Sequence, residues 1–313
     1  MIKRTLCFSN PTYLSLRQMQ MLIRFPEIIN QEGIPQKLKD EAQVTIPVED
    51  IGVVVLDHKQ ITITQGLMAA LLENNCAVVT CDDRHMPVGL HLPLMGNSIQ
   101  NERFRAQLDA SLPLQKQLWQ QTVQQKILNQ AAILQSIGIE QRNMQAWAKD
   151  VKSGDADNLE GRAAAYYWRN LFPSLPDFVR GKEEEPPNNL LNYGYAIVRA
   201  VVARSLVSAG LLPTLGIHHH NRYNAYCLAD DIMEPYRPYA DKAVIDIMQS
   251  GADYKELSTE IKRSLLGIPV MEVVINGTRS PLMTAAQTTA NSLVKCFTGE
   301  MRKLIYPVLD GSV

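Results

Sequence analysis

The chain lacks the features that mark several common classes of protein. It has no Cys-x-x-Cys pair, and its five cysteines are scattered and odd in number, so a disulfide framework is disfavoured and a reduced protein is expected. No uninterrupted apolar run reaches the length of a membrane span, and no signal-peptide core follows the N-terminus. The sequence therefore predicts a cytoplasmic protein without a membrane-spanning segment.

The net charge is also small, since 31 basic and 32 acidic residues leave a formal charge of −1. This balance by itself predicts no polyanionic partner, so a nucleic-acid surface would have to be a local patch or a groove made by several subunits. What is present is an ordinary globular composition. A chain of 313 residues can bury a large core and form two domains.

The first hundred residues contain the short alternating and β-branched segments typical of strands, separated by turn signals. The helical spacing of Leu67, Ala70 and Leu71 predicts one helix at residues 65–74. This part is expected to be a β-rich domain, residues 1–96. Its predicted strands are residues 4–8, 14–16, 19–23, 44–47, 51–57, 61–64 and 77–81.

After a predicted linker at residues 97–104, the pattern is helical to near the C-terminus. Asp157 or Asn158 is expected to cap one helix, and Gly210 closes another. The predicted fold class is therefore α+β, a small β-rich N-terminal domain followed by a larger all-α domain, residues 105–313. Its predicted helices are residues 103–137, interrupted only at Pro113, then 192–209, 235–248, 254–266 and 281–306, with an isolated β-like segment at 270–275.

The most informative segment is a cluster of histidines and carboxylates at residues 216–235. Asp231 and Glu234 stand at i and i+3, so they are expected to share one face of a helix. Upstream, Glu160 is followed by Gly161 and three alanines, which would let another helix pack closely around the carboxylate. Imidazole and carboxylates that converge in space form metal sites. The members of the cluster are His218, His219, His220, Asp230, Asp231 and Glu234.

Simpler interpretations of these residues stay open. Histidine triplets occur on surfaces and in loops, and three consecutive side chains cannot all bind one ion because they point in different directions. The acidic residues could belong to a solvated first helical turn. The His-Glu-x-x-His motif of zinc hydrolases is absent, and the carboxylates favour Mg²⁺ or Mn²⁺. Tyr166, Tyr167 and Trp168 are predicted to lie in the core rather than to stack on bases.

Four motifs stand in order along the helical part, at residues 159–168, 190–196, 210–219 and 228–238. Together they resemble the integrase of the CRISPR adaptation module, and segments 46–56 and 85–89 are similar to the same family. The histidine motif, with Leu-Ala-Asp-Asp downstream, looks most like the type II branch. The resemblance runs over nearly the whole chain, from Arg4 to Phe297.

The resemblance implies three catalytic residues that bind the metal ion, Glu160, His219 and Glu234. The family's histidine follows a Gly-x-x pattern, which falls on His219, and its last ligand closes an Asp-x-x-Glu pattern, which falls on Glu234. Asp231 then lies beside the site as a second acidic group. For the basic residues an ordinary salt bridge is an equal alternative. The candidate DNA- or phosphate-binding residues are Arg222, Arg237, Arg162 and Lys152.

The implied reaction is DNA transesterification with Mg²⁺ or Mn²⁺, in which the 3′-hydroxyl of a short duplex attacks the edge of a CRISPR repeat. His219 could serve as a general acid rather than a ligand. The implied partners are double-stranded DNA, a second copy paired through the β-rich domain, and a smaller companion adaptation protein in a heterohexamer. Other type II adaptation proteins and the effector nuclease are further candidates. A stand-alone metal-dependent nuclease and a non-catalytic DNA-binding scaffold are the alternatives.

Three features depart from the family pattern. His220 adds a third imidazole, the segment around residues 30–43 is long, and the tail after Tyr306 has no clear counterpart. None of them touches the implied ligands.

Overall fold

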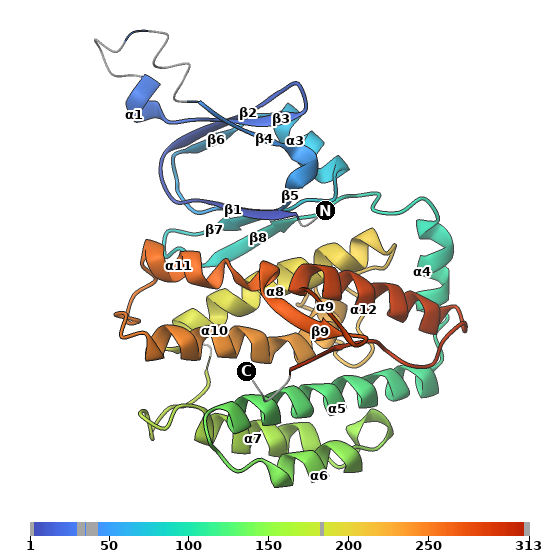
Figure 1. Ribbon diagram of the computed structural model, residues 1–313. Coiled ribbons are helices and arrows are strands. Elements are labelled where there is room, and N and C mark those ends of the chain that lie inside the picture. Colours follow the sequence, from blue (N-terminus) through green and yellow to red (C-terminus); the bar gives the residue numbers. More distant parts are fainter. Residues whose placement is uncertain (1–2, 30–34, 36–42, 182–184, 310–313) are drawn as a thin grey trace. The chain divides into compact units, whose positions relative to one another are not determined.

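The computed structural model describes residues 3–29, 35, 43–181 and 185–309, and its internal contacts divide the chain into two compact units (Figure 1). The first unit is Met1–Gly96 and the second is Asn97–Val313. The segment noted around residues 30–43 lies almost wholly outside the described residues.

The first unit contains two four-stranded sheets. One has the order β1-β5-β7-β8, in which β1, β5 and β7 are parallel and β8 is antiparallel to β7; the other has the order β4-β3-β2-β6. Every predicted strand of this unit is present, and β8 is additional. The elements are β1 (Arg4–Phe8), β2 (Thr12–Arg17), β3 (Gln20–Arg24), α1 (Pro26–Ile29), β4 (Val44–Pro47), η1 (Val48–Asp50), β5 (Ile51–Leu56), β6 (Ile61–Ile63), α3 (Gln65–Glu73), β7 (Ala77–Cys81) and β8 (Pro87–His91).

The core of the first unit forms where α3 meets the strands. Leu67 and Leu71, one helical turn apart on α3, are fully buried in one cluster with Leu14, Met21 and Val54. The apolar residues spaced for one face of α3 and those that alternate along the strands thus pack into one core. This explains why the strands and the helix of this unit could be predicted from sequence.

The second unit is largely helical, as the α+β prediction requires. Its elements are α4 (Gln100–Leu108), α5 (Leu112–Ser136), α6 (Arg142–Asp150), η2 (Ser153–Asp155), α7 (Leu159–Leu171), α8 (Asn188–Ser208), α9 (Cys227–Met233), η3 (Glu234–Tyr236), α10 (Arg237–Gln249), α11 (Thr259–Leu265), η4 (Ile268–Val270), β9 (Glu272–Ile275), β10 (Thr278–Pro281), α12 (Leu282–Phe297) and β11 (Pro307–Val308).

Residues 97–104, predicted to be a linker, are mostly part of α4 instead. Nη1 of Arg103 donates a hydrogen bond to the carbonyl oxygen of Ala209 at 2.6 Å. Nδ2 of Asn97 donates to the carbonyl oxygen of Ser208 at 3.0 Å. These bonds bring side-chain donors to carbonyl groups in the last turn of α8, and they tie α4 into the second unit.

The interruption predicted at Pro113 falls just before it, between α4 and α5. Ser111 caps α5, and its hydroxyl accepts a hydrogen bond from the N–H of Leu114 at 3.4 Å. Pro113 lies in the first turn of α5, where a missing N–H removes no helical hydrogen bond. The proline therefore starts a helix rather than breaking one.

The C-terminal part contains a sheet, so the second unit is not all-α. α12 ends at Phe297, well before the predicted end at residue 306, and Gly299 follows with a φ of 80°, a conformation that ends helices. The chain then returns as β11, which pairs antiparallel with β9, while β10 pairs with the other edge of β9. The segment predicted to be isolated is thus the central strand of three.

α8 is the one described helix long and apolar enough to cross a membrane by length and composition. Of its apolar window, 83% is buried inside the protein. It contacts α9, α10 and α12, and Gly210 closes it with a φ of 78°, as the sequence predicted. α8 is therefore placed as the core helix of the second unit.

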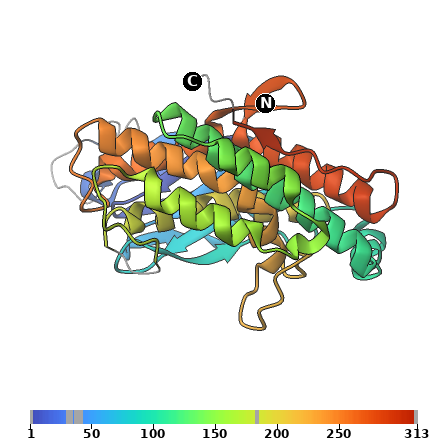
Figure 2. The ribbon, with the colours of Figure 1, turned by 90° about the horizontal axis from the view of Figure 1, so that it is seen from below.

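α5 is the helix around which the candidate site is organised. It contacts α6, α7 and η3, and Figure 2 shows α5, in green, running beside α7, in yellow-green. Trp119, Val123, Lys126 and Gln130 are all buried. Their spacing of three or four residues places them along one face, which we call the buried face of α5.

Candidate active site

Glu160 lies in the first turn of α7, at a well-defined helix start. The side chain of Asn158 caps the helix and accepts a hydrogen bond from the N–H of Gly161 at 3.3 Å, which confirms the predicted cap. Asp155 accepts further bonds from the N–H groups of Leu159 and Glu160, at 2.9 and 3.0 Å. The backbone that carries Glu160 is thereby fixed before its side chain makes any contact.

Glu234 lies where α9 ends and a short 3₁₀ turn leads into α10. Nδ2 of Asn129, on α5, donates a hydrogen bond to the carbonyl oxygen of Pro235 at 2.7 Å and so fixes this turn. The helix ends between Asp231 and Glu234, and their carboxylates have different partners. Glu234, the C-cap of α9, still has helical φ and ψ of −52° and −46°, so the i, i+3 spacing on helical backbone is kept while the two carboxylates have different partners.

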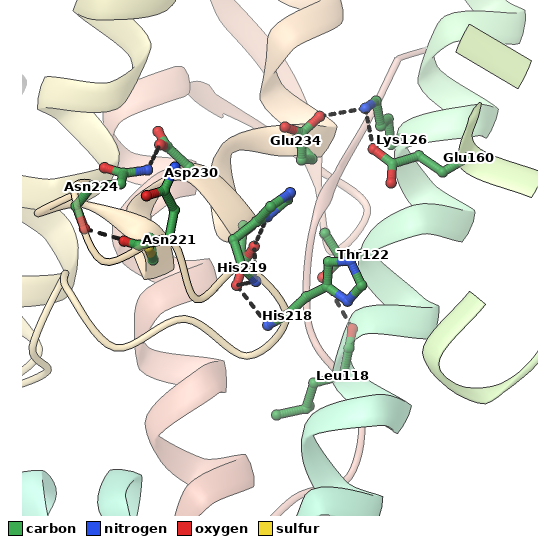
Figure 3. Close-up of polar contacts among 12 residues, drawn as sticks. Leu118, Thr122, Lys126, Glu160, His218, His219, Asn221, Asn224, Asp230 and Glu234 are labelled. Atoms are coloured by element: carbon green, nitrogen blue, oxygen red, sulfur yellow. Dashed lines mark hydrogen bonds and ion pairs between the residues drawn. The ribbon is translucent and has the colours of Figure 1, made fainter. Parts of the chain in front are cut away.

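Lys126 connects the two predicted acidic ligands, as Figure 3 shows. Its Nζ lies 2.6 Å from Oε1 of Glu160 and 2.5 Å from Oε2 of Glu234. Oε1 of Glu234 also accepts a hydrogen bond from Nε of Arg237 at 2.8 Å. Two carboxylates from different helices are thus brought to one point by a single ammonium group.

Sequence reasoning missed Lys126, although a signal was present. Residue 126 follows Trp119 by two helical turns, so a charged side chain falls on the buried face of α5. A buried lysine is rare unless it is paired. The position of Lys126 therefore called for a carboxylate partner, and the structure supplies two.

Burial and charge act in opposite directions on these groups. Burial alone would lower the pKa of Lys126, but the charges of Glu234 and Glu160 outweigh it, and the pKa is raised. Burial would raise the pKa of Glu234, but Arg237 and Lys126 lower it to about 2. Because this folded-state pKa is depressed, the ionised form of Glu234 contributes stability above the unfolded-state pKa, and that contribution is lost as pH falls towards 2.

The loop that carries His218, His219 and His220, which we call the histidine loop, is held by Asp231, whose side chain is fully buried. Oδ2 accepts a hydrogen bond from the N–H of His218 at 2.9 Å, and Oδ1 lies 2.5 Å from Nδ1 of His219. Nδ1 is therefore assigned as the donor to Asp231, and Nε2 of His219 is the ring nitrogen that can bind a ligand once its own proton is lost. The predicted second acidic group is a residue that orients the predicted ligand.

The histidine rings rest on Trp119, from the buried face of α5. The ring of His218 stacks on the indole with centroids 4.1 Å apart and planes 1° apart, and the ring of His219 meets it edge-on at 5.5 Å. His218 is thus engaged in packing. His219 keeps 48% of its side chain exposed, so a substrate can reach it.

The electrostatic surroundings of His219 favour its charged form. The hydrogen bond to Asp231 raises its pKa above 6.5, partial burial opposes this, and the charges of Asp231, Glu234 and Glu160 add to the rise. His219 is therefore within electrostatic range of both predicted acidic ligands. Charged His219 stabilises the fold fully below pH 6.5, and this contribution is lost as pH rises through the folded-state pKa.

The predicted DNA-binding residues occupy different surroundings. Arg237 is the counter-charge of Glu234 and lies over the ring of Tyr195 at 4.6 Å. Lys152 pairs with Asp157 at 2.7 Å. Arg162 lies over Trp147, and Arg222 over Tyr223. Among the described residues, no contact joins Lys152, Arg162 or Arg222 to the predicted ligands, whereas Arg237 belongs to the same cluster.

The donor set fits a divalent cation. In the described part of the chain, no three His, Cys, Asp or Glu side chains form a ready-made metal site, and Lys126 separates the two carboxylates. Oε2 of Glu234, however, is buried and accepts no well-aligned hydrogen bond, since its 2.5 Å contact with Lys126 is an ion pair of poor hydrogen-bond geometry. Two carboxylates and one imidazole suit Mg²⁺ or Mn²⁺.

Comparison with known proteins agrees with the motifs and the fold. A family model for CRISPR associated protein Cas1 matches residues 28–260. The chain is 38% identical over 265 residues to a CRISPR-associated endonuclease Cas1 of Neisseria meningitidis serogroup C (strain 8013), with 84% of this chain and 82% of that relative covered.

Solved structures show the same fold. A casposase bound to integration product has a TM-score of 0.75 at 20% identity, over 100% of this chain and 93% of that one. A Cas6-RT-Cas1–Cas2 complex has a TM-score of 0.71 at 21% identity, over 96% of this chain and 35% of that one. The predicted α+β fold and the predicted family are both confirmed, and the chain belongs to the Cas1 family of CRISPR-associated endonucleases.

Proposed function

We propose that this protein is the divalent-metal-dependent DNA integrase of CRISPR spacer acquisition, which joins the 3′-hydroxyl ends of short duplex DNA into a CRISPR array by transesterification. One observation carries the proposal. The carboxylates of Glu160 and Glu234 meet at the ammonium group of Lys126, and the charges of both raise the pKa of the half-exposed His219.

Glu160, Glu234 and Nε2 of His219 would hold Mg²⁺ or Mn²⁺. Such an ion, when bound, activates the attacking hydroxyl and neutralises charge on the scissile phosphate. Asp231 fixes the ring of His219 through Nδ1, which leaves Nε2 as the ring nitrogen that would act in the reaction. Arg237 supplies permanent positive charge next to Glu234, where negative charge would develop on the phosphate.

Double-stranded DNA, both as prespacer and as CRISPR repeat, is the proposed substrate. A relative by fold is bound to an integration product, and another stands in a complex with Cas2. We extend both partnerships to this chain, with a companion protein of the Cas2 kind completing a heterohexamer in the cytoplasm. The first unit is the proposed dimerisation domain. A groove built from several subunits reconciles DNA binding with a chain charge of −1.

One experiment separates integrase from nuclease and from scaffold. A supercoiled plasmid that carries the repeat is incubated with a short labelled duplex, Mg²⁺ or Mn²⁺, and the companion protein. Label joined to the plasmid supports integration, whereas nicked plasmid without joined label supports a stand-alone nuclease. Unchanged turnover in a Glu160→Ala variant would support the scaffold and contradict the proposed site.

Gly216 provides a milder test of the histidine loop. A Cβ at this position would overlap the carbonyl oxygen of His219 and lie 2.8 Å from Oδ2 of Asp231. Gly216→Ala should therefore displace His219 and lower joining about 10- to 100-fold, since a shift of about 1 Å can cost about 100-fold. The matched control is Gly66→Ala, where a Cβ meets nothing within 4 Å. Full joining activity in Gly216→Ala would show that the loop does not position a catalytic group.

A further inference from the structure

Lys126 is the charged group in this site to which neither the motifs nor the proposed reaction assigns a role. Its side chain is 11% exposed and comes from α5, whereas the carboxylates that it joins come from α7 and from the turn before α10. Three separate segments thus meet at one nitrogen atom.

The ammonium group and a metal ion held by both glutamates would compete for the same carboxylates. Glu160 and Glu234 would hold such an ion through carboxylate oxygens, which are the ligands that Mg²⁺ and Mn²⁺ prefer. Nζ of Lys126 already occupies this place, 2.6 Å from Oε1 of Glu160 and 2.5 Å from Oε2 of Glu234. The ammonium is a compact point charge, so it neutralises both carboxylates much as a metal ion would, while Oε2 of Glu234 has no well-aligned hydrogen bond among the described residues.

A cavity lies beside the side chain of Lys126. Lys126 lines this cavity of about 320 Å³ together with Gln130, Asn192, Tyr195 and Arg180. Gln130 lies one helical turn beyond Lys126, and its Oε1 is a buried acceptor with no hydrogen-bond partner among the described residues. The space beside Nζ is therefore polar, and the guanidinium groups of Arg180 and Arg237 line it as well.

We propose that Lys126 is a built-in counter-cation, which holds Glu160 and Glu234 together while no metal is bound and which a divalent ion must displace to enter the site. The inference rests on the proposed function, because it takes these glutamates as the ligands. Lys126 keeps the two ligands close despite their mutual repulsion, and it raises the metal concentration needed to fill the site.

The test is a calorimetric titration of the full-length protein with Mn²⁺, without DNA, which measures the affinity of the protein for the ion. Lys126→Met keeps the length of the side chain and removes its charge, so Mn²⁺ should bind about tenfold tighter or more, because the two ion pairs of Lys126 no longer compete with the metal. Lys149→Met, an exposed lysine of α6, is the matched control and should bind Mn²⁺ as the wild type does.

Thermal unfolding provides a second readout. Without metal, Lys126→Met should unfold at a lower temperature than wild type, because two carboxylates then face each other, and Mn²⁺ should raise its unfolding temperature by more than it raises that of wild type. A variant that folds only when Mn²⁺ is present would support the proposal equally. Failure of Mn²⁺ to restore an unfolded variant would overturn it.

The outcomes also separate this inference from the proposed function. If Lys126→Met binds Mn²⁺ no more tightly than wild type, while Glu160→Gln weakens binding, the metal site stands and the role given to Lys126 is wrong. If Glu160→Gln leaves Mn²⁺ binding unchanged, the proposed metal site is wrong, and the role of Lys126 with it.

Discussion

Replacing Glu234 by glutamine is expected to lower DNA joining about 1000-fold, the largest loss among the substitutions considered. A bound metal ion stabilises the transition state by several kcal/mol, and each 1.4 kcal/mol changes a rate about tenfold. Glutamine keeps the size of the side chain but removes the charge that Lys126 and Arg237 neutralise. With its pKa at about 2, Glu234 is ionised throughout the neutral range, so the substitution changes the site at every working pH.

The same substitution should also destabilise the folded protein, so folding must be checked in the sample whose activity is measured. Removing one partner from a buried ion pair costs about 3–5 kcal/mol, because the remaining charges stay buried without compensation. Joining must therefore be measured well below the unfolding temperature, with circular dichroism on the same sample. Glu272→Gln is the matched control, since this exposed carboxylate pairs only with exposed Arg279 among the described contacts. Joining at the wild-type rate by folded Glu234→Gln would exclude Glu234 as a ligand.

Asp231→Asn is expected to reduce joining about 10- to 100-fold, the effect usual for a residue that orients a metal-binding histidine. The amide loses the charge that raises the pKa of His219. That pKa should therefore fall, and the charged form of His219 should disappear at a lower pH than in wild type. Titration of the His219 ring protons by NMR measures the shift directly.

Asp230→Asn is the natural comparison, because Asp230 immediately precedes Asp231 in α9 and pairs with Arg199 instead of a histidine. It should leave the pKa of His219 unchanged. Equal His219 titration in Asp231→Asn and wild type would mean that the hydrogen bond to Nδ1 does not control the ring. Equal joining rates would remove Asp231 from the reaction altogether.

Much of the fold is predictable from sequence because its signals are local. The strands of the first unit alternate or are β-branched, Asn158 caps α7, and Gly210 closes α8. The end of α12 was missed because the apolar pattern continues past Gly299, whose left-handed conformation stops the helix. The linker was misjudged because the bonds of Asn97 and Arg103 to the end of α8 join segments far apart in the chain.

In the candidate site, too, some residues could be predicted from local sequence and others could not. Glu160, His219 and Glu234 were predicted from motif resemblance, and they remain predictions as ligands. The partner of each is not local in sequence: Lys126 joins two of them from another helix, and Asp231 reaches back across the histidine loop. Spacing along the chain could place Asp231 beside Glu234, but it could not show that the helix ends between them.

The buried face of α5 has a consequence for protein engineering. This helix contributes none of the three proposed ligands, yet Trp119 lies under the histidine rings, Lys126 sits between the carboxylates, and Asn129 fixes the turn that follows Glu234. Side chains of this one helix thus position three separate segments of the chain relative to one another. A combinatorial library confined to α5 would vary the alignment of all three ligands while leaving every ligand in place.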